Sequence, residues 1–469
     1  MRTRKRILDA AVCGALLSAG PAQGVYLDPD GLGQALIYPY YTTRSADGSP
    51  FNTYLSVVNT TGDAKAVRVR FREPVLGTPV LDFNLFLSPN DMWTAAVVPA
   101  PNGGATAIAH DTSCTLPLGT RQKDGAYAYP LDNTYYVSGG LDRLREGYVE
   151  MIEMASLTGE SAAAVTHVDV YVDDCEAVQA GSLPKAADML PPTGGLMGTL
   201  TLINIASGED FTVNAVALGR LTETPFYGSA PDPYPDFNAA EVTPESQMLV
   251  DGKHYSLGWD NGLDAVTSVL MSTQVLNEFV LDRGTSSQTD WVLTMPTARL
   301  YPLGQAPFTG PTTADNLPLI FYDREQRSYT DGWCYPMQVG CNEPVNMGTV
   351  SVLSFTDYSG GGKPSAVLGS RNIARLIRQD LLFQSGWSSL LLDEFFGWYM
   401  ESTPTSTAYD PIARTTSTGR FRVGGLPITG LMVRTFKNGT LHCGTAACQG
   451  NYGGSFSHRY RRSITYIGP

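Results

Sequence analysis

The stretch "DFNLFLSPNDMWTAAVV" (Asp82–Val98) shows how this chain builds its fold. Apolar side chains fall at every second position from Phe83 to Leu87, which is typical of a half-buried strand. Pro89-Asn90-Asp91 then breaks the strand, and a second apolar run begins at Trp93. We therefore predict a strand, a corner and a second strand. The tryptophan is expected to fill a core between two sheets, and Asp91 to cap the corner rather than to bind a ligand.

The same alternation recurs along the chain. In "AVRVRF" (Ala66–Phe71) the two valines and the phenylalanine share one face and Arg68 and Arg70 share the other, which predicts a half-buried strand. "HVDVYVDD" (His167–Asp174) places its three valines inward and its polar residues outward in the same way. Further strands are predicted at Gly147–Met154 and Asp290–Tyr301.

Helical periodicity is scarce. Gly262–Leu276 is expected to contain a short helix, because its apolar residues fall on one side at helical spacing. Ser370–Phe383 has apolar residues at helical spacing among β-like neighbours, so helix and strand both stay open there.

The composition fits an exported, loop-rich β protein. Charged residues make up only 16% of the 469 residues, whereas 24 Tyr, 48 Gly and 31 Pro are present. The net charge of −13 argues against nucleic acid as a partner, because phosphates need a basic surface. We predict an all-β fold of two or more immunoglobulin-like or jelly-roll-like β-sandwich domains with few short helices.

An internal similarity bears on the number of domains. Asn52–Phe71 resembles Gly198–Leu218 when Gly62 is laid over Gly208, and both segments are interpreted as hairpins. Duplication of a domain explains the match, and so does convergence of exposed hairpins on similar turn residues. A Pro- and Gly-rich segment at Gly181–Gly198 lies between them. The predicted domains are residues 25–190 and residues 191–469, the second with long insertions.

The first residues have the pattern of a secretory signal peptide. A basic start, "MRTRKR", is followed by a mostly apolar segment and by the small residues of "PAQG". Residues 1–24 are therefore predicted to be a leader that is too short to span a bilayer. No later stretch is long enough for a transmembrane helix. The expected location is the cell surface or the extracellular space, with the periplasm as the alternative.

Six cysteines remain after the predicted leader, and an even number in an exported chain suggests disulfides. Sequence alone allows fifteen connectivities. Proximity along the chain favours Cys334 with Cys341 and Cys443 with Cys448, which leaves Cys114 with Cys175. A zinc site is the weaker reading, because the spacings are not those of paired C-x-x-C motifs.

The chain lacks the sequence motifs of the common catalytic sites. It has no G-x-S-x-G elbow and no metal-binding histidine motif, and "SGGGK" (Ser359–Lys363) falls short of a P-loop. Glu150 and Glu153 are expected on opposite faces of a strand, so they offer no carboxylate pair for glycoside hydrolysis. We therefore predict no catalytic residues, no enzymatic activity and no cofactor other than calcium.

Calcium is the ion that the acidic loops fit best. Asp169 and Asp173 are the candidate ligands, since they are expected on one face of the strand at His167–Asp174. Solvated carboxylates explain the same residues.

Four tryptophans are candidate stacking platforms for a sugar ring. "HYSLGWDNG" (His254–Gly262) gathers aromatic and polar side chains that suit such a site, although a tight turn explains the stretch as well. The tryptophans considered are Trp93, Trp259, Trp333 and Trp398.

Six segments together carry a resemblance to known proteins: Ala35–Arg44, Leu55–Glu73, Leu81–Val97, Glu146–Met154, Thr289–Tyr301 and Asn451–Arg462. They resemble a family of largely uncharacterised exported proteins of Gram-negative bacteria, which includes S-layer-like cell-surface proteins. The resemblance implies a surface location and self-assembly, and it supplies no catalytic motif.

These observations predict a secreted or outer-surface structural protein that assembles with copies of itself in an S-layer-like lattice or an extracellular matrix. The alternative is an adhesive module that binds cell-surface glycans. A secreted glycoside hydrolase, with a site assembled from distant loops, is the third reading.

Overall fold

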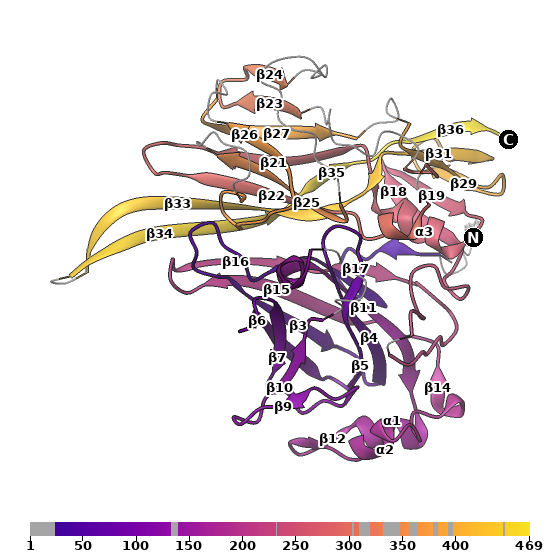
Figure 1. Ribbon diagram of the computed structural model, residues 1–469. Coiled ribbons are helices and arrows are strands. Elements are labelled where there is room, and N and C mark those ends of the chain that lie inside the picture. Colours follow the sequence, from indigo (N-terminus) through magenta and orange to yellow (C-terminus); the bar gives the residue numbers. More distant parts are fainter. Residues whose placement is uncertain are drawn as a thin grey trace, which may run out of the picture.

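A computed structural model describes residues 24–132, 139–230, 232–302, 304–308, 319–331, 348–356, 364–378, 383–392, 397–443 and 446–469. Apart from Gly24, the predicted leader lies outside this range. The described chain is mostly β, with several sheets and a few short helices, so the predicted all-β sandwich class is confirmed (Figure 1).

The first sandwich consists of two antiparallel sheets. The sheet named here the β11 sheet contains, in spatial order, β1 (Tyr26–Leu27), β17 (Val216–Gly219), β2 (Ala35–Thr42), β11 (Glu146–Leu157), β4 (Ala64–Arg72), β5 (Pro79–Leu87) and β8 (Thr115–Leu116), with β14 (Met189–Leu190) paired to β11. The β3 sheet contains β16 (Glu209–Asn214), β15 (Leu196–Asn204), β3 (Asn52–Asn59), β6 (Met92–Pro99), β7 (Ala105–Ala109), β10 (Tyr127–Pro130) and β9 (Thr120–Arg121).

The opening stretch connects these two sheets. β5 ends at Leu87 in the β11 sheet and β6 begins at Met92 in the β3 sheet, so the corner between them carries the chain across the core. The Asp91 carboxylate accepts a hydrogen bond from the Ser88 amide at 2.9 Å, and Trp93 is buried against Phe83, with ring centroids 5.8 Å apart. The predicted corner, its cap and its core tryptophan are all confirmed.

The internal similarity did not mark two equivalent hairpins. β3 and β4 lie in different sheets, so the predicted hairpin at Asn52–Phe71 is wrong. β15 and β16 do form a hairpin, and β15 pairs with β3 in the same sheet. Both sheets of the first sandwich therefore take strands from either side of residue 190, where a domain boundary was predicted. Local turn chemistry specifies a reversal of the chain, but it does not specify which sheet the next strand joins.

A second sandwich follows in the C-terminal half. The β21 sheet contains β24 (Ser328–Asp331), β23 (Leu319–Asp323), β27 (Ser385–Leu391), β21 (Gln274–Val280) and β35 (Arg459–Arg461). The β22 sheet contains β26 (Ile373–Arg378), β25 (Val350–Thr356), β22 (Gln288–Thr294), β33 (Thr429–Cys443) and β34 (Ala446–Ser457). Aromatic side chains fill the space between them, for example Phe279 stacked on Phe355 with centroids 5.3 Å apart. The undecided segment at Ser370–Phe383 thus contains a strand.

Smaller elements complete the described fold. The short strands are β12 (His167–Val168) with β13 (Tyr171–Val172), β20 (Met271–Ser272) with β32 (Leu426–Pro427), the sheet of β18 (Glu245–Val250), β19 (Lys253–Gly258), β29 (Thr407–Asp410) and β30 (Thr415–Thr418), and the sheet of β28 (Tyr399–Glu401), β31 (Arg420–Gly424) and β36 (Ile464–Gly468). The helices are α1 (Gly159–Val165), α2 (Cys175–Gln179), α3 (Gly262–Leu270) and the 3-10 turns η1 (Leu141–Arg145), η2 (Ala186–Asp188) and η3 (Ala298–Leu300). α3 confirms the short helix predicted there, and the Asn261 side chain caps it by accepting from the Asp264 amide.

One hydrophobic core runs through both halves. Val292, Leu431 and Val433 of the β22 sheet belong to the same buried cluster as the interior of the first sandwich. The Thr294 hydroxyl also donates to the Pro39 carbonyl of β2. The strands β22 and β25 of this sheet are therefore covered on both faces, which explains why "WVL" (Trp291–Leu293) is a continuous apolar run rather than an alternation.

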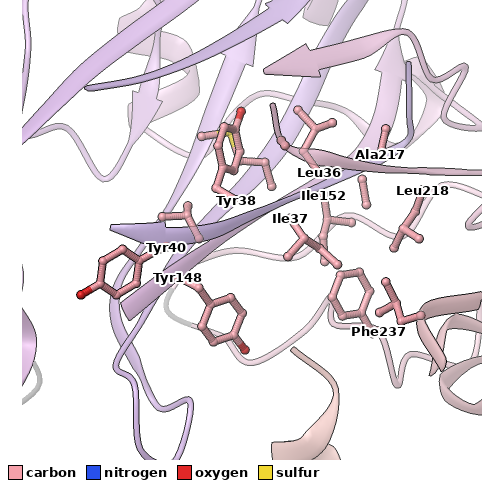
Figure 2. Close-up of a cluster of buried hydrophobic side chains, with 14 of the residues drawn as sticks. Leu36, Ile37, Tyr38, Tyr40, Tyr148, Ile152, Ala217, Leu218 and Phe237 are labelled. Atoms are coloured by element: carbon pink, nitrogen blue, oxygen red, sulfur yellow. The ribbon is translucent and has the colours of Figure 1, made fainter. Parts of the chain in front are cut away.

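The β11 sheet is likewise buried on both faces. β2, β4 and β11 have no exposed residue along their lengths. Ile37 and Phe237 lie on one side of the β2 ribbon and Tyr38 on the other (Figure 2). Phe237 comes from the segment at residues 221–243, which covers the outer face of this sheet. β4 confirms the strand predicted at Ala66–Phe71, but the expectation that this strand is half-buried is wrong, because both of its faces are covered.

Candidate functional site

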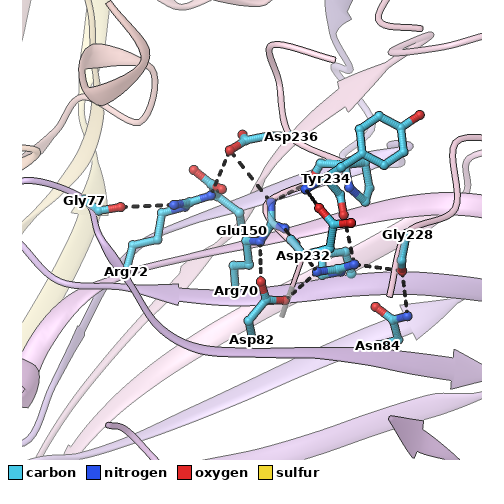
Figure 3. Close-up of polar contacts among 12 residues, drawn as sticks. Arg70, Arg72, Gly77, Asp82, Asn84, Glu150, Gly228, Asp232, Tyr234 and Asp236 are labelled. Atoms are coloured by element: carbon cyan, nitrogen blue, oxygen red, sulfur yellow. Dashed lines mark hydrogen bonds and ion pairs between the residues drawn. The ribbon is translucent and has the colours of Figure 1, made fainter. Parts of the chain in front are cut away.

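The segment that covers the outer face of the β11 sheet encloses three arginines. Arg68, Arg70 and Arg72 alternate along the outer face of β4, and each is at most 1% exposed. Figure 3 shows Arg70 and Arg72 among their polar partners. Arg299, from η3, joins them. A buried cation is costly unless it is paired, so the partners of these groups decide what the cluster can do.

Three carboxylates supply the pairing. Asp82 accepts from Arg68 and Arg70 at 2.9 and 2.8 Å. Glu150 accepts from the Arg72 Nε at 2.6 Å. Asp236 accepts from the Arg299 Nη2 through both oxygens, at 2.6 and 2.7 Å, and from Arg72 at 3.3 Å.

Electrostatics keep this network ionised. Burial alone raises the pKa of Asp236, but the Arg299 and Arg72 guanidinium groups outweigh it and hold that pKa below its ordinary value. Burial lowers the pKa of Arg299, whereas Glu150 and Asp236 raise it to a value well above normal. Burial lowers the pKa of Arg68 in spite of Asp82.

Backbone carbonyls of the covering segment complete the network. Arg68 donates to the carbonyls of Gly228, Asp232 and Tyr234. Arg70 donates to the carbonyls of Asp232 and Pro235. The carboxylate and carbonyl acceptors are thus engaged by guanidinium groups, and the network fastens residues 228–236 onto the β11 sheet. We interpret it as a structural clamp rather than a reaction centre.

Sequence reasoning placed the arginines toward solvent and missed this clamp. The available signal was the acidic residues at facing positions of neighbouring strands, since Arg70 lies opposite both Asp82 and Glu150 in the register. Glu150 and Glu153 do lie on opposite faces of β11, as predicted. Glu153 pairs instead with Lys65 at 2.7 Å.

The candidate calcium ligands do not share a strand face. His167–Asp174 forms two two-residue strands joined by a tight turn, in which Asp169 has a φ of 61°. The single strand predicted there is wrong, because the turn places Val168 and Val170 in solvent, at 60% and 67% exposure. Within the described part of the chain, no three His, Cys, Asp or Glu side chains gather around a common point that would suit a metal ion. A calcium site at Asp169 and Asp173 stays a prediction.

One predicted disulfide lies among the described side chains and is formed. Cys114 bonds to Cys175 at 2.04 Å and ties α2 to the chain next to β8. Cys334 and Cys341 lie outside the described residues, as do the side chains of Cys443 and Cys448. Those two pairings stay predictions.

The tryptophans proposed as sugar platforms are unsuited to that role where they are described. Trp93, Trp259 and Trp398 are each at most 6% exposed. Trp259 donates its indole N–H to the Ser246 hydroxyl and belongs to the core. Trp333 lies outside the described residues.

A further candidate surface on the first sandwich is the outer face of the β3 sheet. Five neighbouring strands, each described along its whole length, present only uncharged side chains there. The outward-facing residues are Met197, Thr199, Thr201 and Ile203 of β15, Asn52, Tyr54, Ser56 and Val58 of β3, Met92, Thr94, Ala96 and Val98 of β6, Thr106 and Ile108 of β7, and Ala128 and Pro130 of β10. Among them, Tyr54 and Met92 are 50% exposed and Met197 is 43% exposed.

Strand register makes this face continuous. Ser56 lies opposite Thr94 on one side and Thr199 on the other, and its hydroxyl bonds to the Thr199 hydroxyl at 2.9 Å. Threonine and serine satisfy one another in this way, so the face stays polar enough for water while carrying no charge. We refer to it below as the uncharged face.

No known protein family, curated protein or solved structure matches this chain. None of the described helices has the length and the apolar composition needed to cross a membrane. The site's own geometry therefore carries the functional argument.

Proposed function

We propose that this chain is an exported, outer-surface structural protein whose copies associate through the uncharged face of the β3 sheet. The observation that carries the proposal is the contrast between that face and the rest of the molecule. The chain has a net charge of −13, yet five adjacent strands present no charge on one side.

Charge explains why this face suits a second copy. Two acidic molecules repel one another, and in physiological salt the repulsion is screened only beyond about 8 Å. Like charges brought into direct contact are costly, so close contact is favoured where neither partner has a charge. Identical copies can meet face to face there, since a two-fold arrangement brings the same patch together from both partners.

The size of the face is of the right order. Five strands spaced about 4.8 Å apart and about 20 Å long cover roughly 480 Å² in projection. The accessible area is larger, because side chains protrude from the plane, and a standard interface buries about 800 Å² per partner. The face therefore supports a contact of modest strength, which suits a lattice in which each molecule has several neighbours.

A matched pair of substitutions tests the proposal. Thr94→Lys adds a positive charge on β6, the middle one of the five strands of the uncharged face, and Thr416→Lys adds the same charge to an exposed residue of β30. Sedimentation velocity and mass photometry on the mature protein, with and without calcium, measure association. We expect concentration-dependent assembly of the wild type, at least a tenfold weaker assembly of Thr94→Lys and an unchanged Thr416→Lys.

Two results would contradict the proposal. A wild type that stays monomeric at about 100 μM under all these conditions would remove self-association. Assembly that tolerates Thr94→Lys but is lost in Thr416→Lys would move the interface away from this face. Surface labelling of intact cells tests the export part separately.

A further inference from the structure

A groove lies where the edges of three sheets meet. β16 is the edge of the β3 sheet, β34 the edge of the β22 sheet and β35 the edge of the β21 sheet. β34 runs beside β16 (Figure 1), and the Ser455 hydroxyl donates to the Thr212 carbonyl at 2.6 Å. The groove has a volume of about 600 Å³, which is within the usual range for small-molecule sites.

An exposed tryptophan lines this groove on a rigid support. Trp387 of β27 is 40% exposed, unlike the three buried tryptophans described above. Tyr322 of the neighbouring strand stacks on it, with centroids 4.1 Å apart and ring planes 9° apart. Because Tyr322 covers one face of the indole, the accessible part of the ring belongs to the other face and its edge. The Trp387 indole is therefore positioned before a ligand binds, so little conformational entropy is lost at this side chain on binding.

Polar groups surround the indole. Glu278, opposite Trp387 in the strand register, lines the groove and pairs with Arg434 at 2.7 Å. The Arg434 guanidinium in turn lies over the Phe456 ring, 4.9 Å from its centroid. This contact holds Arg434 in place, and Arg434 in turn holds the Glu278 carboxylate. Asn214 and Arg459 also line the groove, and neither side chain has a hydrogen-bond partner among the described residues.

We propose that this groove binds a pyranose sugar, as one unit of an oligosaccharide. The apolar face of a pyranose ring packs on an exposed aromatic ring, and its hydroxyl groups need both donors and acceptors around the rim. Trp387 provides the ring, Glu278 an acceptor, and Asn214 and Arg459 donors. The mixture of both charges with a neutral amide suits a polyhydroxylated ligand better than a purely apolar one.

This inference goes beyond self-association and does not depend on it. A structural protein of a cell surface with such a groove would also hold a polysaccharide of that surface. The sugar site expected from the sequence alone at His254–Gly262 is not this one, because Trp259 is buried there and Asn261 caps a helix.

Binding to defined oligosaccharides tests the groove. The probes are three- to five-unit oligomers of glucose, mannose, N-acetylglucosamine and glucuronic acid, presented on a microarray and then titrated by calorimetry. We expect the wild type to bind at least one of them, and Trp387→Ala to weaken that binding at least tenfold. Tyr171→Ala serves as the matched control. It removes an aromatic side chain that is 69% exposed and does not line the groove.

Additional variants keep the test decisive. Asn214→Ala and Arg459→Ala remove exposed groups from the groove and are expected to fold normally, which circular dichroism checks, and each should weaken binding at least threefold. Thr94→Lys, on β6 and outside the groove lining, should bind sugar like the wild type, so failure of self-association and failure of sugar binding are distinguishable. The inference is overturned if no oligomer binds the wild type, or if binding survives Trp387→Ala unchanged.

Discussion

Removing one carboxylate from the buried arginine clamp should unfold this protein far more easily than removing an equivalent carboxylate at the surface. In Asp236→Ala, Arg299 loses both of its short hydrogen bonds to Asp236, at 2.6 and 2.7 Å, and Arg72 loses one at 3.3 Å. Both cations stay buried, because β4 and η3 are held by the rest of the fold. Arg72 keeps Glu150 at 2.6 Å, whereas Arg299 keeps only the longer contact to Glu150 at 3.7 Å. Removing the close partner of a buried charge costs about 3–5 kcal/mol.

Urea unfolding followed by circular dichroism measures this cost. The control is Glu401→Ala, whose partner Arg422 and whose own side chain are 32% and 34% exposed. An ion pair with that much solvent contributes at most about 1 kcal/mol. If the two variants lose the same free energy of unfolding, the clamp does not hold the covering segment and the reasoning is refuted.

A second substitution distinguishes the electrostatic cost at Arg299 from the packing that is lost with the Asp236 side chain. Arg299→Met in the Asp236→Ala background removes a cation that the first change left with only the longer contact to Glu150, at 3.7 Å, so part of the lost stability should return. A double variant that is as unstable as the sum of the two single variants would mean that the charges act independently.

The pH dependence of the same comparison has a defined sign. The pKa of Asp236 in the folded protein lies below its ordinary value of 3.8, so the carboxylate stabilises the fold at pH values above that. The contribution is lost as the pH falls through the folded-state pKa. The difference between wild type and Asp236→Ala should therefore be constant near neutral pH and shrink in strong acid.

Three further predictions concern stability. Burial lowers the pKa of His458 to about 4, so between pH 6.5 and pH 4 only the unfolded chain takes up the proton. The wild type should therefore lose up to about 3 kcal/mol of its free energy of unfolding over that range, and melting curves of His458→Gln should depend less on pH there. Cys114→Ser opens a loop that spans 61 residues and should cost about 4 kcal/mol in urea unfolding, with dithiothreitol destabilising wild type more than the variant. Gly147→Ala would place a Cβ 1.9 Å from the Arg72 carbonyl oxygen, so it should lower the melting temperature by an amount equivalent to about 1–3 kcal/mol, whereas Gly62→Ala, in open space, should not.

Local patterns in the sequence specified much of the first sandwich. The alternation and the Pro-Asn-Asp corner of Asp82–Val98 predicted two strands, their break and a core tryptophan. The short helix at Gly262–Leu270 also follows from its own residues. These features depend on neighbours within a few positions, where side-chain spacing and turn chemistry act directly.

Only the tertiary structure decided where the polar faces of the strands lie. Arg68 and Arg70 have the same alternating pattern whether water or a second layer covers them. The layer that covers them comes from Gly228–Asp236, about 160 positions later in the chain. No local pattern contains that information, because period-two spacing separates two faces without naming what each face meets.

The lining of the groove likewise follows from the tertiary structure and not from any local sequence pattern. Trp387 differs from the buried tryptophans only in the neighbours that long-range pairing gives it, since Tyr322 and Glu278 reach it from other strands. The amino-acid sequence alone determined several of the strands, the Pro-Asn-Asp corner and the acidic net charge. The pairing of strands that are distant in the chain determined which side chains share a surface. Hydrogen bonds between strands depend on distance in space and not on separation in sequence.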